Sequence, residues 1–136
     1  MSLLRKPRPL CACGCGREVA RPFYKFFSNR CQQEFEYQEY IRNWKSGLES
    51  GAIGAMGQVS RHLKRYLREK YNDSCSECGW SERHPITGIV PVEVDHINGD
   101  ASDNREENLR LLCPNHHSLT PNFRALNWGK GRPNRK

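Results

Sequence analysis

The chain has 136 residues, a formal charge of +7, 36% hydrophobic residues and a mean hydropathy of -0.86. This length allows one domain or two very small ones, and the low apolar content leaves little core, so we expect bound metal to add stability. No stretch approaches the roughly 20 apolar residues of a membrane span, which argues against a membrane protein. The positive charge suits a polyanion such as nucleic acid, although mildly basic proteins are common.

Cysteine usage points to metal ligands rather than disulfides. The chain has seven cysteines, an odd number, and its first ten residues contain basic residues and prolines but no apolar run typical of a signal peptide. We therefore expect a reducing, cytoplasmic environment.

The first 46 residues combine a basic arm, a cysteine cluster and a helix. Residues 1–10 form either a disordered terminus or an arm that contacts DNA. A second zinc site is predicted from Cys11, Cys13, Cys15 and Cys31, with a redox-inert or three-thiol cluster as the alternative. Ser28 is expected to cap the helix that follows, and the aromatic stripe over 32–45 is expected to pack rather than to stack on bases.

Glycines at 47, 51, 54 and 57 predict a flexible joint over residues 47–57. A helix is expected over 58–71, because Val59, Leu63, Tyr66 and Leu67 recur at helical spacing. Its basic residues could lie along DNA phosphates or form a solvated face, two interpretations we weigh equally. They are Arg61, Lys64, Arg65 and Arg68.

Two pairs of potential ligands share a two-residue spacing further along the chain. Cys75 and Cys78 can bind one zinc ion together. Cys113 and His116 have the same spacing and would supply a thiolate and an imidazole as the third and fourth ligands. The sequence thus predicts a closed structural zinc site. His84, which precedes a proline, is more typical of a surface loop than of a site.

The stretch between these pairs holds further polar residues. Strands are expected at 89–97 and 109–112, with Asn98-Gly99 as a turn signal. Strict alternation would send Asp95 and His96 to opposite faces, so both can serve one site only if the first strand ends or bulges there. With an asparagine and His117, these are the residue types of a metal-dependent phosphodiesterase. Asn108 is preferred over its rival Asn104, because Asn108 directly precedes an apolar strand.

These residues, in this order, resemble an HNH endonuclease of the small phage or homing type, over roughly residues 75–132. The resemblance implies a small α+β fold with a ββα-metal (treble-clef, His-Me finger) module stapled by zinc, preceded by the N-terminal knuckle and helix. It also implies that Asp95 and His117 bind a catalytic Mg²⁺, Mn²⁺ or Ni²⁺, that His96 is the general base and that Asn108 orients it. One departure is His116, where the family usually has cysteine.

The sequence therefore predicts a DNA endonuclease with its nuclease domain at 58–128 and a basic tail at 129–136, in which Lys130 and Arg132 could contact DNA. DNA is the expected partner. Phage packaging proteins, a host-cell cytoplasmic location and either a monomer or a homodimer are compatible with the resemblance. The alternative is a non-catalytic zinc-finger protein that binds nucleic acid. A pure finger, however, does not need Asp95, His96 and His117 beside a completed zinc site.

Overall fold

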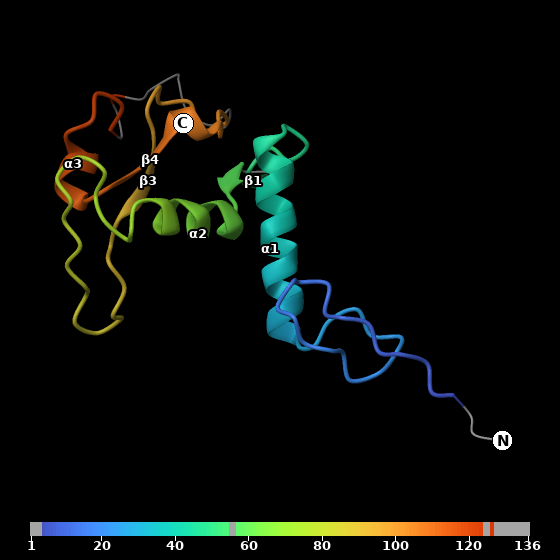
Figure 1. Ribbon diagram of the computed structural model, residues 1–136. Helices are drawn as coiled ribbons and strands as arrows, with labels where there is room; N and C mark the ends of the chain where they lie inside the picture. Colours follow the sequence, from blue (N-terminus) through green and yellow to red (C-terminus); the bar gives the residue numbers. More distant parts are fainter. Residues whose placement is uncertain (1–3, 55–56, 124–125, 127–136) are drawn as a thin grey trace. The chain divides into compact units, whose positions relative to one another are not determined.

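The computed structural model describes residues 4–54, 57–123 and 126, and it has the expected small α+β character (Figure 1). The chain divides into two compact units, residues 1–42 and 43–136. The domain boundaries given above stay predictions. The elements in order are α1 (Asn29–Lys45), β1 (Ala52–Ile53), β2 (Gln58–Val59), α2 (Arg61–Lys70), β3 (Glu93–His96), a 3-10 turn (Glu106–Asn108), β4 (Leu109–Leu112) and α3 (Pro114–Ser118).

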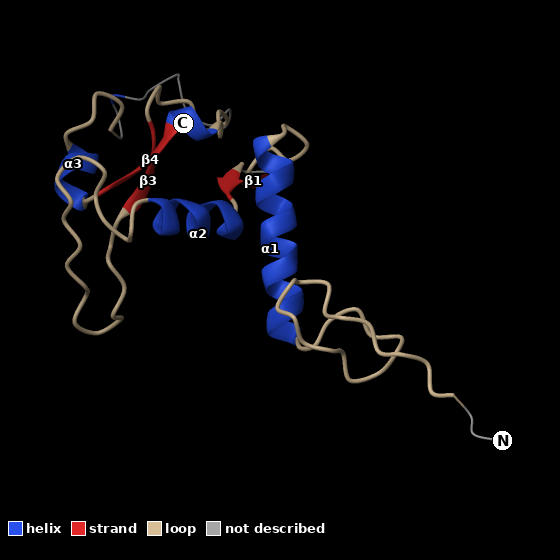
Figure 2. Cartoon of the chain, in the orientation of Figure 1, coloured by secondary structure: helices blue, strands red, loops and turns tan. Residues whose placement is uncertain are grey.

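The first unit consists of a looped segment followed by most of α1 (Figure 2). A bridge between Leu10 and Glu18 closes the loop that carries the first cysteines, and Val19 beside it is fully buried. The helix begins where the sequence predicts, because the Cys31 N–H donates to Ser28 Oγ at 3.2 Å. This capping bond places Cys31 in the first helical turn.

The glycine-rich segment contains a short strand and leads into a second one. Strands β1 and β2 pair antiparallel, with Ala52 opposite Val59. Gly51 is buried and has φ +82°, a left-handed conformation that favours glycine. A β-carbon there would lie 2.7 Å from Leu63 Cδ2. Glycine is therefore needed at 51 both for its backbone conformation and for close packing.

Helix α2 covers the apolar core of the second unit. Ser60 caps it by accepting a bond from the Leu63 N–H at 3.2 Å, and Leu63 and Leu67 are fully buried. The helix starts three residues later than predicted, because Gln58 and Val59 pair with β1 instead.

Strands β3 and β4 form an antiparallel hairpin that leads directly into α3 (Figure 2). The register places Asp95 opposite Arg110 and His96 opposite Leu109. Strand β4 spans the predicted residues, whereas β3 covers only the end of the predicted 89–97 strand. Pro91 cannot donate a ladder hydrogen bond, and residues 84–89 close a loop of their own. Among the described residues, no helix is long and apolar enough to cross a membrane.

Candidate active site and metal centres

The ligand pairs predicted for the C-terminal site come together in the structure. Cys75, Cys78, Cys113 and His116 place their ligand atoms within 4.8 Å of one another. Cys113 Sγ lies 3.3 Å from His116 Nδ1 and 3.9 Å from Cys78 Sγ, and Cys75 Sγ lies 3.8 Å from the same imidazole nitrogen. Tetrahedral zinc, with bonds of about 2.0–2.3 Å, would hold such atoms roughly 3.3–3.8 Å apart. The donor set and spacing therefore fit a zinc ion.

Backbone geometry prepares these ligands. The Cys75 N–H donates to Trp80 O at 2.9 Å, which closes the first knuckle, and Pro114 opens α3 with Cys113 at its N-cap. Burial opposes ionisation of the Cys75 thiol, but backbone hydrogen bonds from Cys113, Cys78 and Glu77 outweigh it and lower its pKa to about 6. A thiolate is the form that binds metal, so the fold favours the binding state.

The four N-terminal cysteines also converge. Ligand atoms of Cys11, Cys13, Cys15 and Cys31 lie within 4.8 Å of one another, and Cys11 Sγ is 3.4 Å from Cys13 Sγ. Burial opposes ionisation of Cys11, but backbone hydrogen bonds from Phe27 and Cys13 lower its pKa to about 7. A four-thiol cluster of this kind can hold one tetrahedral zinc.

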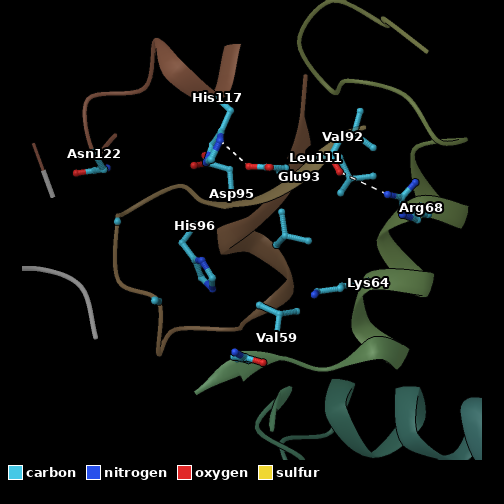
Figure 3. A pocket seen from close by; sticks show the side chains of 14 residues that line it. Val59, Lys64, Arg68, Val92, Glu93, Asp95, His96, Leu111, His117 and Asn122 are labelled. Carbon is cyan, nitrogen blue, oxygen red and sulfur yellow. Dashed lines mark hydrogen bonds and ion pairs between the residues drawn. The ribbon is translucent and has the colours of Figure 1, made fainter. Parts of the chain in front are cut away.

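Several of the remaining candidate residues line one cleft of the second unit, about 610 Å³ in volume, whereas Asn108 does not. Asp95, His96 and His117 all contribute to it. Figure 3 shows these three side chains around the cleft, with Lys64 extending into it from α2. The cleft thus combines carboxylate, imidazole and ammonium groups.

The end of β3 explains how neighbours in a strand reach the same cleft. His96 is the last residue of β3, and the chain turns immediately, with the Gly99 N–H donating to His96 O at 2.9 Å. The sequence required the strand to end or bulge at these residues for both to serve one site, and β3 does end at His96.

Two charged partners of these residues were not singled out from the sequence. Asp95 Oδ2 accepts from Arg110 Nε at 2.8 Å, and His117 Nδ1 lies 2.8 Å from Glu93 Oε2. Glu93 could have been found, because residues two apart on a strand share a face and Glu93 precedes Asp95 by two. Arg110 could not, since its position opposite Asp95 depends on the strand register.

The two asparagines considered above have different contacts. Asn104 Oδ1 lies 2.7 Å from His96 Nε2. Since an amide oxygen can only accept, this contact requires the proton on Nε2 and leaves Nδ1 of His96 with a lone pair. Asn108 instead ties the turn together: its Oδ1 accepts from the Asn98 N–H at 3.0 Å, and its Nδ2 donates to Asn98 Oδ1 at 2.9 Å and to Asp103 O at 2.8 Å. The direct contact to His96 therefore comes from Asn104.

The basic residues of α2 divide by their contacts. Arg65 pairs with Glu69 at 2.8 Å. Arg68 lines the cleft but also pairs with Asp73 at 2.9 Å, and it donates to Val90 O at 3.3 Å. Arg61 is exposed and Lys64 lines the cleft. The predicted DNA contacts Lys130 and Arg132 lie outside the described residues.

Comparison with known proteins places this site in a family. Residues 86–119, which include Asp95, His96, both asparagines and His117, match the HNH endonuclease family model. The chain is also 29% identical over 97 residues to the H-N-H endonuclease F-TflIV of Escherichia phage T5. Residues 86–119 therefore belong to the HNH endonuclease family. We refer to this segment as the HNH module.

The relatives extend well beyond the region they share with this chain. The T5 alignment covers 68% of this chain and 40% of the phage protein. The Zorya protein ZorE of Escherichia coli (strain ATCC 8739) is 28% identical over 107 residues, covering 77% of this chain and 26% of ZorE. No solved structure matches the chain significantly. The chain thus spans less than half the length of each of these relatives.

Proposed function

We propose that the protein is a metal-dependent DNA endonuclease of phage-related origin, built on a ββα-metal fold formed by β3, β4 and α3. The observation that carries the proposal is the convergence of Asp95, His96 and His117 in one cleft of the HNH module. These are an oxygen ligand, an imidazole base and a nitrogen ligand.

A catalytic divalent ion would be held by Asp95 and His117. Oxygen and imidazole donors together suit Mg²⁺, Mn²⁺ or Ni²⁺, and the Glu93 carboxylate beside His117 adds negative charge where the cation would sit. Such an ion would stabilise the negative charge that develops on the phosphate and on the departing oxygen.

His96 would act as the general base. When the Nε2–H group of His96 donates a hydrogen bond to Asn104 Oδ1, the Nδ1 atom of the same ring can take a proton from water. The resulting hydroxide forms a bond to phosphorus, the bond from phosphorus to the 3′ oxygen breaks, and that oxygen takes up a proton. The products would be a 3′-hydroxyl and a 5′-phosphate.

Lys64 would bind the scissile phosphate or a neighbouring one. It projects from α2 into the cleft, where an ammonium group can attract a phosphodiester. Arg65 and Arg68 already have carboxylate partners, so we assign the leading electrostatic role on α2 to Lys64.

Structural zinc ions would occupy both cysteine-containing clusters. The C-terminal ion would join the knuckle at 75–78 to the start of α3, and so fix the helix that carries His117 against the hairpin. The N-terminal ion would join the cysteine loop to α1. Neither ion has a free position for catalysis when all four ligands bind, which leaves the chemistry to the cleft.

The test is incubation of the zinc-loaded protein with supercoiled plasmid in Mg²⁺, Mn²⁺ or Ni²⁺. Conversion to nicked or linear DNA should require added metal and should be lost in His96→Ala, while DNA binding and zinc content persist. His84→Ala is the matched control, because His84 lies in an exposed loop outside the cleft. An unchanged cleavage rate in His96→Ala would contradict the assignment of the base. No cleavage by folded protein in any metal would favour the non-catalytic nucleic-acid-binding protein.

A further inference from the structure

The loop over residues 17–27, between the third and fourth cysteines of the N-terminal cluster, exposes aromatic rings beside cations. Phe23, Tyr24 and Phe27 are 74%, 44% and 43% exposed. Soluble proteins rarely gather large exposed apolar side chains in one short loop unless the surface binds something. The loop is anchored at Val19, which is fully buried, and by the Ala12 N–H, which donates to Lys25 O at 3.0 Å.

Each exposed ring is paired with a neighbouring group. The Arg17 guanidinium lies 5.0 Å from the centroid of the Phe27 ring, and that of Arg21 lies 5.9 Å from the Tyr24 ring. Phe23 meets Tyr24 edge to face, with ring centroids 5.0 Å apart. Flat cations and rings arranged in this way offer stacking surfaces with positive charge beside them.

The charge of the chain is concentrated in the same region. Residues 1–30 contain seven basic side chains and one acidic one, a net +6 of the total +7, so the other 106 residues together contribute only +1. Lys25 adds to the loop itself and lies 4.6 Å from the Phe35 ring. The chemistry of the surface therefore calls for an anionic partner that also has flat apolar faces.

We propose that the 17–27 loop binds single-stranded nucleic acid, with phosphates on Arg17, Arg21 and Lys25 and unpaired bases stacked on Phe23 and Phe27. In a duplex the base faces are already stacked on each other, so exposed rings gain little from it. In a single strand they are accessible. A lipid surface is a poorer fit, because insertion of Tyr24 or Phe27 would dehydrate the guanidinium that lies over each ring. This binding site shares no residue with those that line the cleft, and it does not depend on cleavage.

The test uses the full chain, zinc-loaded, with His96→Ala in every sample so that no DNA is cut. Fluorescence anisotropy would measure binding of labelled oligo(dT) and of a duplex of equal length over a range of salt concentrations. One variant carries Phe23→Leu and Phe27→Leu, which keep apolar bulk but remove the rings. A second carries Arg17→Gln, Arg21→Gln and Lys25→Gln. Zinc content and the thermal transition establish that each variant is folded.

The controls are matched in chemistry. Arg42→Gln removes one charge near the opposite end of α1, and Leu48→Ala truncates a side chain that is 79% exposed. Both should bind oligo(dT) within twofold of the parent.

The double leucine variant should bind oligo(dT) about five- to hundredfold more weakly, and its duplex affinity should stay within about twofold. The triple glutamine variant should reduce the slope of log affinity against log salt concentration for oligo(dT) by about two, because each lost cation removes roughly 0.7 from that slope. Unchanged oligo(dT) affinity in the leucine variant would overturn the proposal. The same variant would also be tested for binding to anionic phosphatidylserine vesicles. Loss of vesicle binding with intact oligo(dT) affinity would assign the loop to a lipid surface and overturn the proposal.

Discussion

Substituting the two asparagines of the hairpin loop one at a time separates positioning of the base from stability of the loop. Asn104→Ala removes one hydrogen bond to His96, worth about 1–1.5 kcal/mol, so cleavage should fall about tenfold. Stability should change little, because Asn104 Nδ2 is buried without a hydrogen-bond partner in the described part of the chain and its loss removes an unsatisfied group.

Asn108→Ala removes three hydrogen bonds instead. At about 1 kcal/mol each, their loss should cost about 3 kcal/mol of unfolding free energy. For a unit of this size that corresponds to a fall in melting temperature of roughly 15 °C. Asn108 should therefore act on the His96 site only through the folded loop.

The assay is single-turnover plasmid nicking well below either melting temperature, beside differential scanning calorimetry of the same samples. Asn104→Asp serves as a second variant, since its carboxylate can still accept from Nε2 and should retain more activity than alanine. If Asn104→Ala cuts at the parental rate while Asn108→Ala loses tenfold without a change in melting temperature, the base is positioned through Asn108, as the family resemblance implies, and our reasoning from the contacts is wrong.

Three further outcomes are expected. Gly51→Ala should lower the unfolding free energy by about 2 kcal/mol or more in urea titrations, because φ is +82° and the new carbon would lie 2.7 Å from a side chain of α2. Gly54→Ala, with φ +71° and open space around it, should lose only about 1 kcal/mol. Cys78→Ser should remove one zinc per chain by elemental analysis and abolish the thermal transition of the second unit, since zinc contributes on the order of 10 kcal/mol; retained zinc would refute its role as a ligand. The hydrogen bond from Tyr66 lowers the pKa of Glu106, so the stabilisation from this bond is present above about pH 4.5 and is lost as the pH falls through the lowered pKa. Tyr66→Phe should therefore lower the unfolding free energy by about 1 kcal/mol at pH 7, and the difference from the parent should narrow in acid. A difference that stays constant with pH would assign the effect to packing.

The features that could be predicted from the sequence are those fixed by local spacing. The two-residue separations of Cys75 and Cys78 and of Cys113 and His116 let each pair bind one metal ion, so the four-ligand cluster could be predicted from residues close along the chain. The cap at Ser28 is local in the same sense.

The features that could not be predicted depend on contacts between distant segments. The packing of Gly51 against Leu63 becomes apparent only once α2 is in place. The choice between Asn104 and Asn108 depends on how the polar loop between β3 and β4 folds back on His96, and no periodic pattern encodes that path. The pairing of Arg110 with Asp95 depends on the hairpin register.

Trp44 gives this site an intrinsic optical probe. Its indole Nε1 donates to the backbone oxygen of Asn104 at 2.8 Å, and the Asn104 side chain contacts His96. Trp80 instead packs against the cluster of Cys75, Leu112 and Cys113. The emission of Trp44 should thus respond to rearrangement of the loop beside the base, and that of Trp80 to metal loading. With Trp128, the third tryptophan, replaced by phenylalanine, substituting Trp44 or Trp80 in turn lets the two events be followed separately in real time.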